Sequence, residues 1–384
     1  MANQPSIGRL FIAFFKLGTT AFGGPSMVAY IRKLAVERFG WMSAADFAEG
    51  VSFCQIIPGA TAMQTAAYVG LRVHGAMGAA AAYIGFGLPA FGLMLLFSYL
   101  YTANGSVPFI AGLFSGLQAI VVAVVLNAAW SFGKTTIKGW WHTAIAVVAA
   151  GAFIANLHPI FVIVFAAAAG WWLLPRSESS TPVNPTHRPY PGKLLGLILA
   201  VVVGGYVGLF FLARDLFELG LLMARVDLMA FGGGFASVPL MYHEVVETYA
   251  WTDSATFMNG IVMGQVTPGP IVITATFIGF LHAGWAGALI ATISVFLPSF
   301  LLVIGLWPVF HRLTALRYFH PVMSGVLCSF VGLLASVALR FIIQVPWDVV
   351  RLLLAAGALL ALLRKVDILW VVLAGAVLSA VLIR

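Results

Sequence analysis

The sequence predicts an all-α polytopic membrane protein made of two inverted-topology repeats with broken, re-entrant helices. The first observation behind this prediction is composition: the 384-residue chain is 62% hydrophobic and only 8% charged. Soluble domains carry about 25% charged residues, so this chain lacks the residues for a water-compatible surface. Apolar runs such as Ala79–Tyr101, Leu194–Phe211 and Gly284–Leu306 are long enough to cross roughly 30 Å of hydrocarbon. Helices satisfy their own backbone polar groups there, whereas open sheets cannot.

The second observation is an internal repeat, which is the first thing to search for in a long chain. The first copy carries, in order, Phe22–Pro25, Gln55, Pro58–Ala60 and Leu88–Phe91. The second copy carries Phe231–Gly234, Gln265, Pro268–Pro270 and Leu297–Phe300. Matching positions are 209 or 210 residues apart throughout. The same structural unit is therefore expected twice.

The segments between the copies predict that the second copy is inverted. The first repeat is assigned to residues 1–174, followed by a polar cytoplasmic linker at 175–193 that is rich in Pro, Ser and Thr. One connecting transmembrane helix is assigned to 194–213, and the second repeat to 214–384. A single extra crossing turns the second repeat upside down in the membrane.

Charge supports this inversion, because Lys and Arg accumulate in cytoplasmic loops. The first broken segment is followed by Arg32, Lys33 and Arg38. The matching stretch of the second repeat carries Glu244, Glu247 and Asp253. We therefore expect a multi-pass protein of the inner (plasma) membrane with a cytoplasmic N-terminus and an external C-terminus. The net charge of +8 has the same explanation, and without a basic run no nucleic-acid partner is expected.

The third observation is that two segments of the first repeat, about residues 7–38 and 44–73, are broken in the middle by Gly and Pro. At 1.5 Å per residue, half of such a segment is too short to cross the membrane. We interpret the segments as re-entrant hairpins, which keeps their basic residues on the cytoplasmic side. In the alternative, each broken segment crosses the membrane once.

The breaks predict a binding site for an anion. A Gly followed by a Pro ends one helix and starts another, and a helix N-terminus offers free N–H donors and about half a positive charge. Transporters with inverted repeats place such half-helix ends around the substrate. The alternative is that these glycines only let helices pack closely. The candidate substrate-binding residues at the breaks are Phe22, Gly23, Gly24, Pro25, Pro58, Gly59, Phe231, Gly232, Gly233, Gly234, Pro268, Gly269 and Pro270.

Polar side chains beside the breaks extend the candidate site. Lys16 stands six residues before Phe22, and Arg225 six residues before Phe231. Cations inside apolar segments are costly and commonly functional, although a lysine can also snorkel to the interface. Gln55 and Gln265 could donate amide N–H groups to an oxyanion, and Thr267 a hydroxyl.

Three acidic residues are candidates for coupling: Asp46, Asp227 and Glu244. The competing interpretation of Asp46 is a helix cap, because Ser43-x-x-Asp46 has the capping-box spacing, and Asp253 begins the matching helix. Asp227 lies two residues from Arg225 and is expected to temper that charge rather than carry protons.

Several function classes have no support in the sequence. Cys54 and Cys328 are isolated, and no His or Cys spacing suggests a metal site. No cofactor is expected, and no nucleophile–base pair or nucleotide-binding loop points to an enzyme. The N-terminus shows no cleavable signal pattern.

With its motifs FGGP…QxxPGA and FGGG…QxTPGP, the sequence resembles the chromate transporter family, in its long two-domain form. The resemblance covers both repeats and implies an inner-membrane exporter of chromate, with halves of opposite orientation. It places the family's glycine-rich motifs at Phe22–Pro25 and Phe231–Gly234 and its PGP motifs at Pro58–Ala60 and Pro268–Pro270. The chain departs from the family pattern at Ala60 and at Asp227, where a small residue is usual.

We therefore expect a transporter that exports chromate or a similar tetrahedral oxyanion by alternating access. Two negative charges that leave a negative interior gain about 4.6 kcal/mol per 100 mV, so membrane potential can drive efflux, with or without a proton gradient. A transporter or channel for another anion such as sulfate is the alternative, and a membrane sensor or scaffold lacks an output domain. The expected partners are the oxyanion and membrane lipid; a homodimer is left open.

Overall fold

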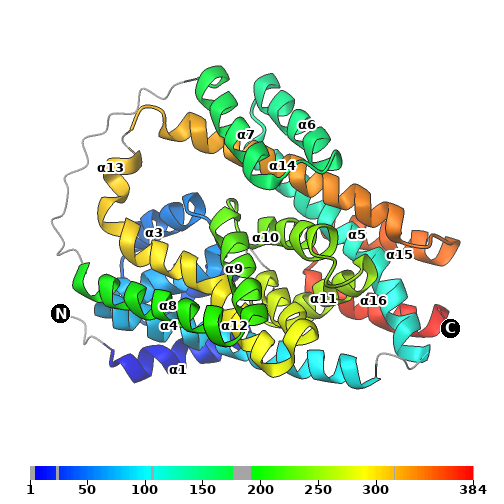
Figure 1. Ribbon diagram of the computed structural model, residues 1–384, viewed down its shortest axis with the longest axis horizontal. Coiled ribbons are helices and arrows are strands. Elements are labelled where there is room, and N and C mark those ends of the chain that lie inside the picture. The colour runs from blue at the N-terminus through cyan, green and yellow to red at the C-terminus, as the bar shows by residue number, and fades with distance from the viewer. Residues whose placement is uncertain (1–4, 23–25, 105–107, 176–191, 315, 384) are drawn as a thin grey trace. The chain divides into compact units, whose positions relative to one another are not determined.

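The computed structural model describes residues 5–22, 26–104, 108–175, 192–314 and 316–383. These residues form α-helices with a few 3₁₀- and π-helical turns, and no strand occurs among them (Figure 1). This confirms the all-α fold class. The polar linker predicted at 175–193 lies, from residue 176 to 191, outside the described residues.

The chain divides into two compact units, and each unit contains parts of both repeats. Unit 1 consists of residues 1–103, 187–237 and 263–309, and unit 2 of residues 104–186, 238–262 and 310–384. The broken segments of the first repeat lie in unit 1, those of the second repeat are divided between the two units, and the last three helices of each repeat belong to unit 2. The repeat boundaries at 174 and 214 stay predictions from the sequence.

Unit 1 holds the described residues of the four breaks and the helix ends beside them. Its first-repeat elements are α1 (Ile7–Gly18), α2 (Ser26–Arg32), the π-helix η1 (Lys33–Arg38), α3 (Ala44–Ile56) and α4 (Thr61–Asn104). The connecting segment adds α8 (Gly192–Leu212). The second repeat adds α9 (Arg214–Met229), the start of α10 (Gly234–Tyr242), the end of α11 (Ser254–Val266), η3 (Ile271–Ile273), α12 (Thr274–Leu306) and η4 (Trp307–Val309).

Unit 2 is a set of apolar helices that pack on α14 and α5. Its elements are α5 (Pro108–Thr136), α6 (Trp140–Ile154), α7 (Pro159–Leu173), most of α10 and α11 with the π-helix η2 (His243–Thr248) between them, α13 (Phe310–Thr314), α14 (Phe319–Gln344), α15 (Val349–Leu363) and α16 (Ile368–Leu382). Small residues allow close approach here: a Cβ on Gly170 of α7 would lie 2.4 Å from the Pro321 carbonyl oxygen.

Five of the described helical segments are long and apolar enough to cross a membrane: Thr61–Ala103, Gly112–Thr136, Leu195–Leu212, Ile271–Val309 and Phe319–Gln344. In the segment of α8, no residue is buried, which suits a helix that faces lipid. The protein is therefore a multi-pass membrane protein.

The broken segments of the first repeat double back as hairpins. In the first, the Arg9 guanidinium near the start of α1 lies 5.5 Å from the Phe39 ring centre just after η1. In the second, Asp46 at the start of α3 pairs with Arg72 of α4 at 2.7 Å. Each segment thus returns to the end at which it began, as expected for re-entrant helices and not for segments that cross once.

The two longest helices, α4 and α12, each bend sharply at one glycine. Gly75 in α4 has a φ of 61° and Gly284 in α12 a φ of 57°, values that glycine adopts without steric cost. Beyond each bend the helix turns back on itself: a Cβ on Gly70 would lie 2.1 Å from the Gly78 carbonyl oxygen. The two bends are 209 residues apart, so the repeat is visible in the backbone.

Other backbone features repeat in the same way. The π-helical turns η1 and η2 start 210 residues apart, at Lys33 and His243. Left-handed residues follow them at Gly40 (φ 59°) and Ala250 (φ 49°). An alanine in this region is strained, so its presence shows that the turn geometry is imposed by the surrounding helices.

Candidate functional site

Two hydrogen bonds in unit 1 connect the breaks of one repeat to those of the other. The Gly59 N–H donates to the Ala230 carbonyl oxygen at 3.0 Å, and the Gly269 N–H donates to the Ala21 carbonyl oxygen at 3.0 Å. Donors and acceptors are repeat-related, so the pair of bonds is reciprocal. The second break of each repeat therefore lies against the first break of the other. The residues Gly23, Gly24 and Pro25 themselves lie outside the described residues.

This arrangement brings helix N-termini together. A Cβ on Gly233, next to the first residue of α10, would lie 3.2 Å from the Thr61 Oγ1 atom at the start of α4. A Cβ on Gly234 would lie 3.3 Å from Val272 in η3, which leads into α12. The starts of the α-helices α4 and α10 each contribute N–H groups that have no partner within the helix and about half a positive charge. Their convergence favours an anion.

Gly59 and Gly269 are glycines because their positions exclude a side chain. Both lie in the left-handed region, with φ of 116° and 122°. A Cβ on Gly59 would lie 2.3 Å from the Ser299 Cβ atom, and one on Gly269 would lie 2.8 Å from the Ala90 Cβ atom. Ser299 and Ala90 are themselves repeat-related, so the same close contact is built twice.

A buried polar cluster adjoins Gly59. The Ser299 N–H of α12 donates to Asp227 Oδ2 of α9 at 2.7 Å, and the Tyr83 hydroxyl of α4 donates to the Phe296 carbonyl oxygen at 2.7 Å. Gln64 Nε2 donates to the Pro58 carbonyl oxygen. Pro298 disturbs the hydrogen-bond ladder of α12 just before Ser299, which explains why this N–H is paired with a side chain.

The structure corrects the expected role of Asp227. Residues two apart on a helix do not face each other. The Asp227 carboxylate faces α12 and accepts the Ser299 N–H instead of tempering the charge of Arg225. In the first repeat the matching position is Gly18, where a Cβ would lie 2.4 Å from the Phe86 carbonyl oxygen. In the first repeat, the close approach of α1 and α4 leaves room only for glycine at this position. In the second repeat, the same position of α9 carries the Asp227 carboxylate, which accepts a hydrogen bond from α12.

The two cations predicted beside the breaks lie in different environments. Lys16 in the last turn of α1 is exposed, and the hydroxyl of Thr19 donates to its carbonyl oxygen at 2.8 Å. Arg225 of α9 is half-buried. The repeat-related pair is therefore not equivalent, and the cation that is withdrawn from the surface is Arg225.

The polar candidates at the second breaks also differ. Gln55 is exposed, whereas Gln265 is half-buried and its Nε2 atom has no hydrogen-bond partner among the described residues. The Thr267 hydroxyl donates to the Gly264 carbonyl oxygen at 3.0 Å, so its proton is already used within the helix end. Phe22 and Phe231 are both half-buried beside their breaks.

Asp46 belongs to the capping box of α3, in which Ser43 is the N-cap. Its backbone N–H donates to Ser43 Oγ at 3.0 Å, and Asp253 caps the matching helix through the Thr256 N–H at 2.7 Å. The Ser43 hydroxyl and the Arg72 guanidinium bind the Asp46 carboxylate and hold its pKa below the ordinary value. A carboxylate that stays ionised at neutral pH is unsuited to carry protons. Glu244 is buried in η2, which belongs to unit 2.

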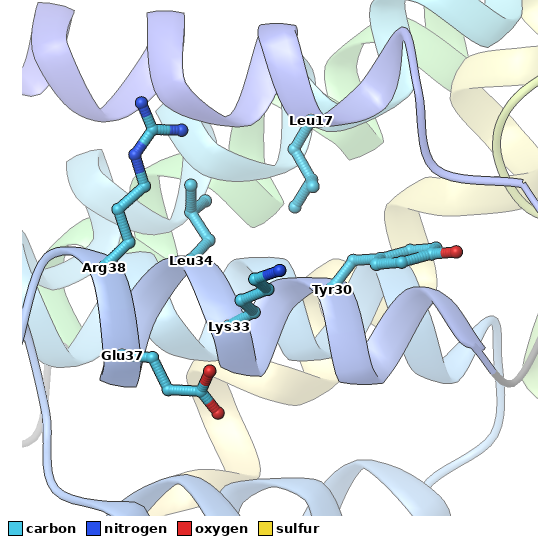
Figure 2. A pocket seen from close by; sticks show the side chains of 6 residues that line it. All are labelled: Leu17, Tyr30, Lys33, Leu34, Glu37 and Arg38. Carbon is cyan, nitrogen blue, oxygen red and sulfur yellow. The ribbon is translucent and has the colours of Figure 1, made fainter.

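A basic groove lies between the two arms of the first hairpin in unit 1. It has a volume of about 370 Å³ and is lined by Leu17, Tyr30, Lys33, Leu34, Glu37 and Arg38. Figure 2 shows the Arg38 side chain reaching toward α1 and the Glu37 carboxylate pointing away from it. Glu37 pairs with Arg32 at 2.7 Å, which leaves the charge of the groove positive.

Sequence reasoning missed Gln64, Ser299 and Tyr83. All three are buried, and their polar atoms meet across segments that are up to 216 residues apart. One signal was present: Ser299 lies in the repeated Leu-Pro-x-Phe motif at the position of Ala90. A polar residue in only one copy of a repeated apolar motif indicates a specific role.

The inverted helical repeats, the apolar spans and the converging breaks define a membrane transporter. The family model described as "Chromate transporter" matches the chain twice, at residues 8–171 and 217–380. The chain therefore belongs to the chromate transporter family, in its two-domain form. The two matches correspond to the two repeats read from the sequence.

Curated relatives agree with this assignment. An uncharacterised transporter of Methanocaldococcus jannaschii is 39% identical over 98% of this chain and 94% of its own length. The chromate transport protein of Cupriavidus metallidurans is 27% identical over 91% of this chain and 87% of its own length. A protein of the same name from Pseudomonas aeruginosa is 28% identical over 86% of this chain and 80% of its own length. No solved structure matches the chain.

Proposed function

We propose that the protein exports chromate or a similar tetrahedral oxyanion from the cytoplasm by alternating access. The observation that carries this proposal is the reciprocal pair of hydrogen bonds from Gly59 to Ala230 and from Gly269 to Ala21. Through them, breaks from two inverted repeats meet in one compact unit. A site shared by inverted repeats can be exposed to either side of the membrane when the repeats exchange conformations.

The chemistry of the breaks suits an oxyanion. The starts of α10, α4 and η3 approach one another, and each offers backbone N–H donors. The half-buried Arg225 on α9 adds a cation near its break, and the Gln265 amide has a buried N–H₂ group with no partner among the described residues. A tetrahedral dianion has four acceptor oxygens and needs this kind of donor-rich surrounding.

The proposed orientation and the charge of the chain support export as the direction of transport. With the basic segment Arg32–Arg38 on the cytoplasmic side, the groove beside Lys33 and Arg38 would attract anions from the cytoplasm. A dianion that leaves gains about 4.6 kcal/mol per 100 mV of membrane potential. We place the N-terminus in the cytoplasm and the C-terminus outside the inner membrane; reporter fusions to each end would test this orientation.

A flux assay with purified protein tests the proposal. Proteoliposomes loaded with chromate, sulfate or chloride are given a membrane potential that is negative inside, and release of each anion is measured. We expect release of chromate to exceed that of chloride at least tenfold. Equal rates for all three anions would indicate a channel, and preferred release of sulfate would identify another oxyanion as the substrate.

The groove beside η1 gives a separate prediction. Replacing Lys33 and Arg38 with Glu should lower kcat/KM for oxyanion flux about three- to tenfold at low salt, because steering of the anion is reversed. The effect should shrink at high salt, where exposed charges are screened. Lys138→Glu, an exposed cation in unit 2, is the matched control. An effect that is independent of salt would contradict a steering role.

A further inference from the structure

The polar cluster around Asp227 contains two buried oxygen atoms that lack a hydrogen-bond donor. Asp227 and Gln64 are both fully buried, with exposed fractions of 0%. Asp227 Oδ1 and Gln64 Oε1 have no hydrogen-bond partner among the described residues. Their other polar atoms are paired: Asp227 Oδ2 accepts the Ser299 N–H, and Gln64 Nε2 donates to the Pro58 carbonyl oxygen. The cluster is therefore short of donors and rich in acceptors.

Asp227, through its partner Ser299, and Gln64 both lie beside Gly59. A Cβ on Gly59 would lie 2.9 Å from Ser299 Oγ and 2.8 Å from Gln64 Nε2. Ser299 binds Asp227, so Gln64, Gly59, Ser299 and Asp227 form a continuous series of neighbours. Gly59 also donates to the Ala230 carbonyl oxygen at the first break of the second repeat. Only Ser299 therefore separates Asp227 from Gly59, whose N–H forms the hydrogen bond between the repeats.

No charged group among the described residues compensates an ionised Asp227. From α12 it meets Ser299, which is neutral, and from α4 it interacts with Tyr83, whose hydroxyl contacts Ser299 Oγ at 3.2 Å. From α8, the Tyr206 hydroxyl binds Gly220 and Ser294. Arg225 lies on its own helix, two residues away, on a different side. Burial in such surroundings disfavours the ionised form of a carboxyl group.

We infer that Asp227 carries a proton in this conformation and is the proton-binding site that couples transport to a proton gradient. The neutral carboxyl group turns one of the acceptors in the cluster into an O–H donor, which the cluster lacks. In transport, the carboxyl group takes up a proton and later releases it to the other side of the membrane, so that a proton enters as the oxyanion leaves. The coupling, but not the protonation, rests on the proposed export function.

Infrared spectroscopy tests the protonation without any transport. Wild-type protein with isotope-labelled aspartate is expected to show the C=O stretch of a protonated carboxyl at neutral pH. Asp227→Asn should remove this band, whereas Asp215→Asn, an exposed aspartate of the same helix, should leave it. Absence of the band from the wild-type protein would overturn the inference, whether or not the variant folds. Asn preserves the shape of the side chain and adds an N–H₂ donor, so we expect normal thermal stability.

Flux measurements test the coupling. With the membrane potential clamped at zero, a pH gradient that is acidic outside should speed chromate or sulfate release from wild-type proteoliposomes. Asp227→Asn should reduce this stimulation at least tenfold, whereas the exposed Asp215→Asn variant should keep it in full. A variant that still responds fully to the pH gradient would overturn the coupling role. A wild-type protein with the infrared band but no oxyanion flux would refute the proposed function and leave the protonation intact.

Discussion

Gly59→Ala is expected to reduce oxyanion flux at least tenfold and to lower the thermal stability of the protein. The new Cβ atom would lie 2.3 Å from the Ser299 Cβ atom and 2.8 Å from Gln64 Nε2. An alanine at a φ of 116° costs about 1–3 kcal/mol in backbone strain, and forcing extra volume into a packed interior costs about 1–3 kcal/mol more. Relief of the clash would move the loop whose N–H binds Ala230.

A second substitution separates the clash from the strain. Ser299→Gly removes the side-chain atoms nearest to the new methyl group, so the double variant should regain part of the stability lost in Gly59→Ala. The backbone strain at residue 59 persists in the double variant. Gly151→Ala in α6, where no atom lies within 4 Å of the added Cβ, is the matched control and should behave as wild type. Thermal unfolding and initial flux rates measure both effects, and a fully active Gly59→Ala protein would contradict the tight contact.

Arg225→Gln is expected to reduce oxyanion flux at least tenfold, and Lys16→Gln only about two- to threefold. A unit charge about 4 Å from an anion contributes roughly 4 kcal/mol at an effective dielectric constant of 20, and much less where water screens it. Arg225 is half-buried and Lys16 is exposed, so the two repeat-related cations should contribute unequally. Initial rates of chromate release at fixed membrane potential measure the difference.

The control for this pair is Arg214→Gln, which removes an exposed cation at the start of the same helix, α9, where Arg214 pairs with Glu218. Its flux should match that of wild type. If the double variant of Lys16 and Arg225 kept its full chromate flux, neither cation would belong to the anion site.

Much of the architecture could be predicted from local sequence. Ser43 and Asp253 both cap their helices as expected, because capping is decided by residues three apart in the chain. The breaks at Pro58–Ala60 and Pro268–Pro270 are also local, because a proline followed directly by a glycine interrupts helical hydrogen bonding and favours a turn at that point. The hairpin at α3 and α4 follows from the same breaks, because half-helices that cannot span the membrane must return.

The contacts of the site could not be predicted in this way. Asp227 was expected beside Arg225 because the two are close in sequence, yet its partner Ser299 is 72 residues away. Thr267 was expected to donate to an oxyanion, but its hydroxyl proton is taken by the carbonyl oxygen of Gly264. Lys16 and Arg225 are equivalent in the repeat and differ in burial. Burial and pairing depend on which helices pack together, and this information is spread over the whole chain.

The sequence by itself determined that this chain is a helical membrane protein with an inverted repeat and four breaks, because apolar composition, loop charge and Gly-Pro spacing act locally. Only the tertiary structure decided that the second break of each repeat binds the first break of the other, through Gly59 with Ala230 and Gly269 with Ala21. It also decided that Asp227 is enclosed with Ser299 and Gln64. The reason is that a backbone donor freed at a break will bind any acceptor within reach, and packing of distant segments selects which one that is.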